Sequence, residues 1–173
     1  MKEGINPNLA ANTGCTPVWI ASSNGHHKCM EILIMYGADV DKPEQSDGIT
    51  PLFAAAGNGN RKAVEILLAS KADINKATES GKFSPLMIAA QKEHHQVVNV
   101  LLKSDADAFQ VNTAGGDAFL LASAYGHLEC IKVIHKHLLS GMDMIKLLIY
   151  YYNLMLIHFK WMKMDMMHLL LLH

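Results

Sequence analysis

The chain has 173 residues, of which 50% are hydrophobic and 18% are charged, and its formal net charge is −1. This composition is typical of a globular chain that is long enough to bury a hydrophobic core. The balance of 15 basic and 16 acidic residues argues against nucleic acid as a partner, because phosphate backbones are bound by a surplus of Lys and Arg.

A pair of residues typical of a helix start recurs along the chain at intervals of 33 or 34 residues. The four copies are Thr16-Pro17, Thr50-Pro51, Ser84-Pro85 and Asp117-Ala118. Thr, Ser and Asp side chains accept hydrogen bonds from free N–H groups at a helix start, and proline suits the first helical position. Each copy therefore predicts a helix of about two turns, and a turn such as Asn58-Gly59 ends it.

A longer apolar-periodic segment follows each of these short helices. The four segments are residues 26–36, 60–70, 94–104 and 127–137. In the second of them Val64, Leu67 and Leu68 recur at helical spacing, while Lys62 and Glu65 are left to face water. One such helix pair cannot bury its apolar face alone, so neighbouring pairs must stack. The sequence thus predicts an all-α solenoid of repeated units.

The repeated motifs resemble the ankyrin repeat over residues 12–139. Gly-x-Thr-Pro-Leu, a mid-helix alanine, a Gly-His turn and Gly-Ala-Asp-Val keep a common register, and the best copy is residues 46–77. The resemblance implies helix pairs joined by hairpin loops, here called fingers. The expected repeats cover about residues 12–45, 46–78, 79–112 and 113–141. Alanines at one equivalent position should lie against the neighbouring helices, and these are Ala21, Ala55, Ala89 and Ala122.

Several positions depart from the family pattern. The family usually has His after Thr-Pro-Leu, but this chain has Trp19, Phe53, Met87 and Leu120. Apolar packing is therefore expected to replace the polar tie that this His makes. Glu93, Lys71 and Asp105 occupy turn positions that favour glycine, and a left-handed backbone at Glu or Lys costs on the order of 1 kcal/mol.

Both ends differ from the repeats. Residues 1–11 resemble the finger of a preceding repeat, which favours a fragment of a longer array. Residues 142–173 are apolar and rich in methionine, and three interpretations stay open. The segment is a helix that covers the last repeat, an extension without an evolved role, or a membrane anchor. The longest uncharged stretch, 147–159, is shorter than the roughly 20 residues that span a bilayer, which argues against the anchor.

The sequence predicts no catalytic, cofactor or metal site. The histidine doublets at 26–27 and 94–95 occupy the same repeat position, which indicates a structural role. His127 and Cys130 are only two ligands, and a structural zinc site needs four. Cys29 and Cys130 stand at an equivalent apolar position, so both are expected to be buried.

Most other polar motifs fit turns. "ESGKFS" lacks the first glycine of a phosphate-binding loop. The periodic aspartates lie beside turns, where this residue is common. The three cysteines without CxxC spacing favour the cytosol or nucleus, where disulfides are rare.

The resemblance implies a non-catalytic module that binds another protein through its concave face and finger tips. The family's contact positions map onto Trp19, Ser23, Asn24, Asp47, Ile49, Phe53, Asn58, Gln91, Lys92, Ala124 and Tyr125. Simple packing between repeats is the alternative for Trp19 and Phe53. The expected state is a monomer, with self-association through residues 142–173 as the alternative. A second hypothesis is that these repeats target or regulate a larger enzyme, channel or membrane-anchored protein.

Overall fold

The computed structural model describes residues 6–141, 148, 150–152, 155 and 156. The chain divides into two compact units, residues 1–134 and 135–173. Helices α1 to α7 lie in the first unit, and α8 begins in the first unit and ends in the second. The interpretations of residues 142–173 concern a segment that lies almost wholly outside the described residues.

The short first helices begin where the sequence predicts them. They are α1 (Pro17–Ser23), α3 (Pro51–Gly57), α5 (Pro85–Gln91) and α7 (Ala118–Ala124). Each is capped by the residue before it, whose side-chain oxygen accepts a hydrogen bond from the backbone N–H three residues on. The N–O distances are 3.2 Å at Thr16, 3.1 Å at Thr50, 3.3 Å at Ser84 and 2.8 Å at Asp117. The predicted capping residues are therefore confirmed.

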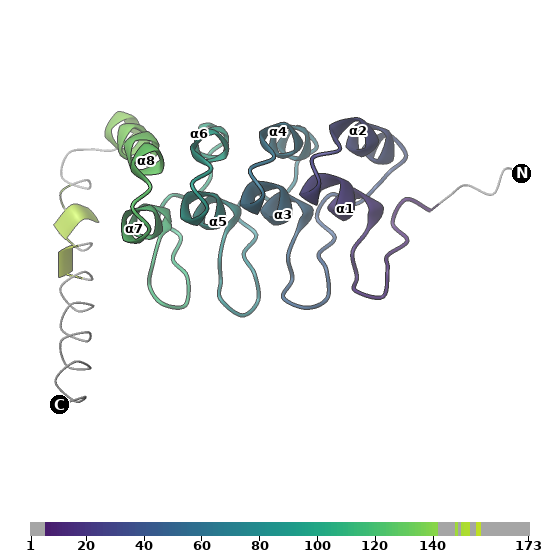
Figure 1. Ribbon diagram of the computed structural model, residues 1–173, viewed down its shortest axis with the longest axis horizontal. Coiled ribbons are helices and arrows are strands. Elements are labelled where there is room, and N and C mark those ends of the chain that lie inside the picture. Colours follow the sequence, from purple (N-terminus) through teal and green to yellow (C-terminus); the bar gives the residue numbers. More distant parts are fainter. Residues whose placement is uncertain (1–5, 142–147, 149, 153–154, 157–173) are drawn as a thin grey trace, which may run out of the picture. The chain divides into compact units, whose positions relative to one another are not determined.

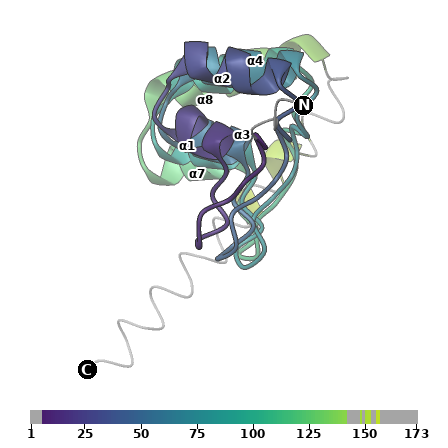
Figure 2. The same cartoon turned by 90° about the vertical axis from the view of Figure 1, so that its right-hand side faces the viewer.

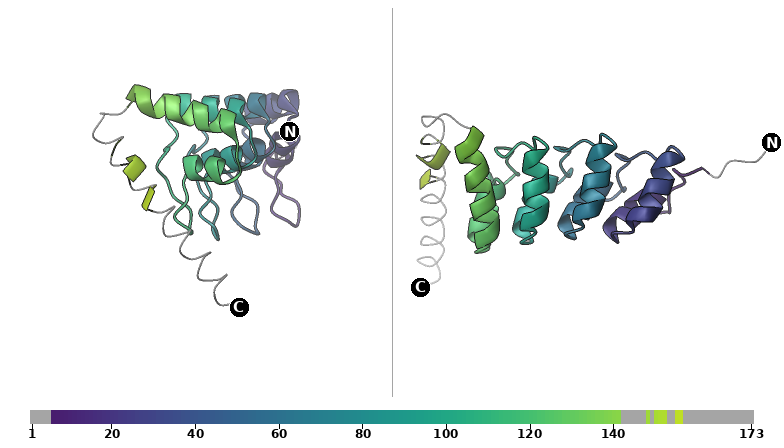
Figure 3. Two further views of the ribbon diagram at one scale, coloured as in Figure 1. Left: turned by 60° about the vertical axis from the view of Figure 1, so that its left-hand side comes forward. Right: turned by 90° about the horizontal axis from the view of Figure 1, so that it is seen from above.

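The second helices follow after a tight turn. They are α2 (His27–Met35), α4 (Arg61–Ala69), α6 (His95–Lys103) and α8 (Leu128–Gly141). In the first unit, α1, α3, α5 and α7 form one row, and α2, α4 and α6 form a second row, which lies above the first in these views (Figures 1 and 2). The view from above shows successive pairs side by side along the row (Figure 3).

The core of the first unit lies between these two rows. Leu52 and Leu86 of the first helices and Val64, Leu67 and Leu101 of the second helices are at most 1% exposed. The four small residues predicted to lie against neighbouring helices are also buried, at 5%, 0%, 0% and 0% exposure for Ala21, Ala55, Ala89 and Ala122. The described residues thus form an all-α solenoid of stacked helix pairs, as the sequence predicts.

Fingers project from one side of the helix rows (Figure 1). They are the first finger (residues 6–16), the second (36–50), the third (70–84) and the fourth (104–117). A buried polar residue closes each of the last three. Glu44, Thr78 and Asn112 all pair their backbone N–H with a carbonyl across the hairpin, at 3.0, 3.0 and 2.9 Å. Their side chains, 4–8% exposed, also accept backbone N–H groups within the finger.

Neighbouring fingers are joined by backbone hydrogen bonds. Glu79 N–H donates to the Asp47 carbonyl at 2.9 Å, and Thr113 N–H donates to the Gly81 carbonyl at 3.0 Å. A side chain also joins the second finger to the third, because the Asp41 carboxylate accepts a hydrogen bond from the Asp73 backbone N–H at 2.9 Å. Asn8 makes the same bond to the next finger, accepting at 2.7 Å. These bonds hold the fingers in a common register.

The residue before each of α4, α6 and α8 links that helix to the preceding repeat. The Asn60 amide donates to the Ser22 carbonyl at 3.0 Å. His94 Nε2 lies 3.1 Å from the Gly57 carbonyl, and His127 Nε2 lies 2.9 Å from the Gln91 carbonyl. These contacts cap the carbonyl end of the preceding first helix. His94 therefore has the structural role that its register indicates, whereas His26 at the same repeat position is exposed.

Left-handed backbone occurs at the three predicted positions. The φ angles are 65° at Lys71, 65° at Glu93 and 64° at Asp105. A fourth case, Lys82 with φ 55°, is not anticipated from the sequence. Lys82 stands 34 residues after Gly48, whose φ is 69°, so it occupies the glycine position of its finger.

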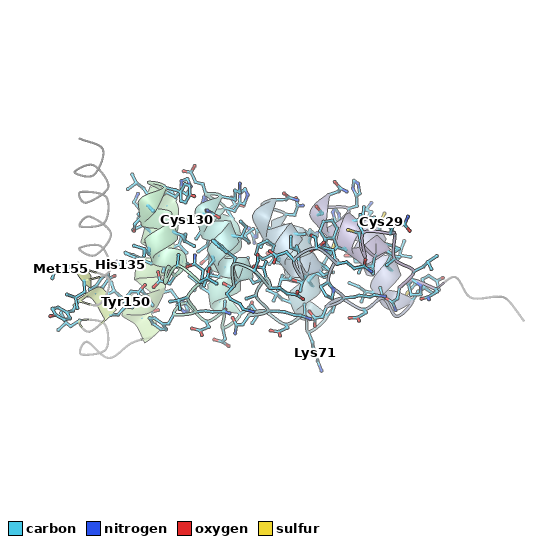
Figure 4. All side chains as sticks on the ribbon, turned by 90° about the horizontal axis from the view of Figure 1, so that it is seen from below. Cys29, Lys71, Cys130, His135, Tyr150 and Met155 are labelled. Carbon is cyan, nitrogen blue, oxygen red and sulfur yellow. The ribbon has the colours of Figure 1, made fainter. Side chains whose placement is uncertain are left out.

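Two packing predictions are wrong. Cys130 is fully buried, and burial raises the pKa of its thiol to about 11, but Cys29 at the equivalent position is exposed. The equivalents of Cys29 have a preceding helix pair beside them, whereas the described residues place none beside Cys29 (Figure 4). Trp19 also keeps a polar tie, because its indole Nε1 donates to the Ile49 carbonyl at 2.8 Å.

Candidate partner-binding surface

The predicted contact residues lie on three adjoining parts of the repeats. Ser23, Asn24, Asn58, Gln91, Lys92, Ala124 and Tyr125 are at the C-terminal ends of the first helices. Trp19 and Phe53 lie in the first turn of α1 and α3, and Asp47 and Ile49 belong to the second finger. We refer to this collection as the concave surface.

Hydrogen bonds between repeats join several of the helix-end residues. The Asn58 amide donates to the carbonyl and the hydroxyl of Ser23, both at 2.9 Å. Two repeats further on, the Gln91 amide donates to the Tyr125 hydroxyl at 2.9 Å. Because each bond spans a repeat boundary, it fixes the side chains that it joins relative to the neighbouring repeat.

Tyr125 is the large aromatic residue that this row offers to solvent. It is 57% exposed and stacks on the His127 ring at a centroid distance of 6.0 Å. Lys92 and Ala124 beside it are exposed as well. An aromatic side chain held by stacking and by a hydrogen bond from Gln91 loses little freedom on binding, which suits a contact residue.

Trp19 differs from these residues because it is half-buried and its N–H is already bonded to the Ile49 carbonyl. That bond joins the first repeat to the second. The structure therefore places Trp19 at a junction between repeats, whereas Asn24 is exposed at the end of α1 with its amide bonded to the Ile20 carbonyl at 3.0 Å.

A surface cavity of about 290 Å³ brings four of the predicted residues together. Its lining comes from the second finger, the third finger, α3 and α5, and consists of Asp47, Ile49, Phe53, Thr78, Ser80, Gly81, Phe83, Ile88 and Gln91. Residues from two consecutive repeats thus converge on one hollow of the concave surface.

Five of the lining residues are not predicted by the sequence reasoning. Register identifies two of them, because Phe83 stands 34 residues after Ile49 and Gly81 stands 34 residues after Asp47. Thr78 and Ser80 of the third finger and Ile88 of α5 have no predicted contact residue at the equivalent position, and the place of Ser80 beside Asp47 depends on how the two fingers stack.

Asp47 gives the cavity a negative charge. Its carboxylate accepts the Ser80 backbone N–H at 2.7 Å, and this bond together with one from the Ser80 hydroxyl lowers its pKa. Both bonds favour the ionised form. Asp47 therefore stays charged at neutral pH although the third finger lies against it.

In the described part of the chain, no three His, Cys, Asp or Glu side chains lie close enough together to hold a metal ion. No helix within the same residues is long and apolar enough to cross a membrane.

Comparison with protein families gives one match. The family model described as ankyrin repeats (3 copies) matches residues 1–78 and again residues 77–144. A search of curated proteins found no match to the chain. The family match covers more than half of the sequence and coincides with the stacked helix pairs, so the chain belongs to the ankyrin repeat family.

Proposed function

We propose that this protein is a non-catalytic interaction module, a scaffold or adaptor that binds a partner protein through its concave surface. Ankyrin repeats are generally protein-interaction modules and are typically non-catalytic. The observation that carries the proposal is the cavity on which Asp47, Ile49, Phe53 and Gln91 converge from two repeats.

The size and setting of the cavity favour a protein partner. At about 290 Å³ it is at the lower limit of the roughly 300–1,000 Å³ that is usual for small-molecule sites. One of its lining residues, Gln91, donates a hydrogen bond to the exposed Tyr125 and directly precedes the exposed Lys92. A hollow of this size within a larger surface suits one anchoring side chain of a partner with further contacts around it.

The proposal also includes the cellular compartment and the oligomeric state. Free thiols at Cys15, Cys29 and Cys130 fit a reducing compartment, the cytosol or the nucleus. We expect a monomer to be the binding species, because the proposed surface lies entirely within residues 1–134.

A matched pair of double variants tests the proposed surface. The full chain is immobilised, and proteins captured from a cell extract are identified by mass spectrometry. Tyr125→Ala with Lys92→Ala should remove captured proteins, because both side chains are exposed on the concave surface. Tyr36→Ala with Lys62→Ala removes the same two residue types from the C-terminal cap of α2 and from α4, and it should leave capture unchanged.

Thermal unfolding of both double variants is the control for folding. Equal loss of capture by the two variants, or no loss by either, contradicts the proposed surface. Unfolding of the Tyr125 and Lys92 variant would instead show that these residues hold the fold together, which also contradicts their assignment as contacts.

A further inference from the structure

The cavity between the second and third fingers combines apolar walls with a few polar groups. Ile49, Phe53, Phe83 and Ile88 supply the apolar side chains, and Asp47 supplies the charge. Its volume of about 290 Å³ is nearly twice the roughly 150 Å³ of an apolar cavity that binds benzene. The space therefore fits one large aromatic side chain.

The neighbouring repeat junction shows a polar contact that this junction lacks. Trp19 of the first repeat donates its indole N–H to the Ile49 carbonyl, which also accepts the Glu44 backbone N–H. One repeat later the corresponding residues are Phe53 and Phe83. The Phe83 carbonyl accepts the Thr78 N–H at 3.0 Å, but the phenyl ring of Phe53 has no donor to offer it.

This difference has two consequences for the cavity. A phenyl ring in place of an indole leaves more space next to the third finger. It also leaves acceptor capacity on the Phe83 carbonyl, since a carbonyl oxygen has two lone pairs. An incoming aromatic side chain with its own N–H or O–H group would use both the space and the acceptor.

The charge beside the cavity favours a cation. Asp47 lines it and is held ionised by Ser80. Glu79 adds a second negative charge nearby, because its side chain lies against the backbone of Gly48 in the second finger. Lys82 follows in the third finger and is exposed, with its backbone in the left-handed region. Among the residues that line the cavity, the charged one is Asp47.

We propose that the cavity binds one aromatic side chain, Trp or Tyr in preference to Phe, from a linear segment of the partner protein, with an adjacent Lys or Arg that pairs with Asp47. The proposal rests on the proposed function, because it names the feature of the partner that the concave surface recognises. Removal of a centrally buried aromatic anchor commonly weakens binding at least about 30-fold, whereas loss of an exposed ion pair weakens it about 2- to 5-fold.

A selection from randomised linear peptides displayed on phage tests the proposal with the full chain as the target. Enriched peptides should share an aromatic residue next to Lys or Arg. A synthetic copy of the best binder should lose at least about 30-fold in affinity when its aromatic residue is replaced by Ala. Enrichment of peptides without an aromatic residue, or no enrichment at all, would overturn the proposal.

Two substitutions in the chain test the cavity itself. Phe53→Trp introduces the residue that the first repeat has, fills the space and supplies a donor to the Phe83 carbonyl. It should weaken the peptide at least about 30-fold while the melting temperature stays the same or rises. Leu120→Trp makes a similar change at the equivalent position of the fourth repeat and should leave affinity unchanged. Phe83→Ala, which removes a wall, should also weaken binding.

Asp47→Asn tests the charge. It should lower affinity about 2- to 5-fold at low salt, and the loss should disappear when the Lys or Arg of the peptide is replaced by Ala. Asp73→Asn is the matched control, because Asp73 also accepts a backbone N–H in a finger but does not line the cavity. Equal effects of the two substitutions contradict the proposed ion pair.

The two proposals can fail separately. In one outcome, the peptides bind Phe53→Trp as tightly as the unaltered chain but no longer bind the Tyr125 and Lys92 double variant. That result overturns the cavity proposal and supports the concave surface. Loss of cavity binding alone, with protein capture insensitive to the double variant, supports the cavity and contradicts the wider surface.

Discussion

Glu44 shows how much one buried side chain organises. It is 8% exposed, and its carboxylate accepts four hydrogen bonds at 2.6–3.1 Å, from the N–H and hydroxyl of Ser46 and the N–H groups of Asp47 and Ile49. Burial alone would raise the pKa of this carboxyl, but the hydrogen bonds outweigh it and hold the pKa at about 2. The bonded residues include two that line the cavity, so Glu44 supports the shape of the second finger.

This carboxylate predicts an acid-sensitive contribution to stability. Because the pKa is lowered from 4.5 to about 2 on folding, the stabilisation is fully present above about pH 5 and is lost as the pH falls towards 2. Glu44→Gln should lower the free energy of unfolding by about 1–2 kcal/mol at pH 7, a figure that allows for solvent screening. Denaturant titrations should show the difference from the unaltered chain shrinking between pH 5 and pH 2.

Glu31→Gln on α2 is the control for the loss of one exposed carboxylate, and it should change stability little at any pH. A gap between Glu44→Gln and the unaltered chain that stays constant between pH 5 and pH 2 would contradict the role given to the Glu44 hydrogen bonds.

At the scale of the helix, the short helices of each repeat are stabilised by contacts with neighbouring repeats. Helices of seven and nine residues are below the roughly 12–15 that are marginally stable alone in water. Their ends are closed by caps within the repeat, such as Thr50, and by ties from the next repeat, such as His94 to the Gly57 carbonyl. The C-terminal end of α3 therefore depends on a residue 37 positions away.

The ties predict a difference between two histidines of the same repeat position. His94→Ala should lower the free energy of unfolding by about 1 kcal/mol, because it removes the contact with the Gly57 carbonyl. His26→Ala is the matched control and should change stability little, because His26 is exposed and the described residues place no helix pair ahead of it. Urea titrations of both variants measure this, and equal effects would show that the tie contributes nothing.

At the scale of the first unit, stability is a sum over repeats and the interfaces between them. The inner helices α3, α4 and α5 have a helix pair on both sides, whereas α1 and α2 have one on one side only among the described residues. In this first repeat Cys29 is exposed, and Ile20 and Ile32 are 45% and 53% exposed.

Hydrogen exchange should show that the first repeat is less stable than the inner repeats. We expect backbone amides of α3, α4 and α5 to exchange at least about tenfold more slowly than those of α1 and α2, because opening the first repeat breaks one interface and opening an inner repeat breaks two. Mass-spectrometric exchange of the full chain at neutral pH measures it. Uniform protection from α1 to α5 would instead indicate that the unit opens only as a whole.

Most of the local structure can be predicted from the sequence. The caps at Thr16, Thr50, Ser84 and Asp117 follow from side-chain chemistry that acts over a few residues. The stacking alanines and the left-handed turns at Lys71, Glu93 and Asp105 follow from the repeat period, which sets equivalent positions in each copy. The resemblance to the ankyrin repeat, and not side-chain chemistry, predicts Asp47, Ile49, Phe53 and Gln91 as contact residues.

Tertiary structure alone decided which side chains meet across the repeats. The neighbours of each repeat determine three observed arrangements. Trp19 donates to the Ile49 carbonyl, and Cys29 is exposed while Cys130 is buried. Thr78 and Ser80 lie with Asp47 around one cavity. The repeat period makes these positions equivalent along the chain, but the burial of each side chain is set by its neighbours in space.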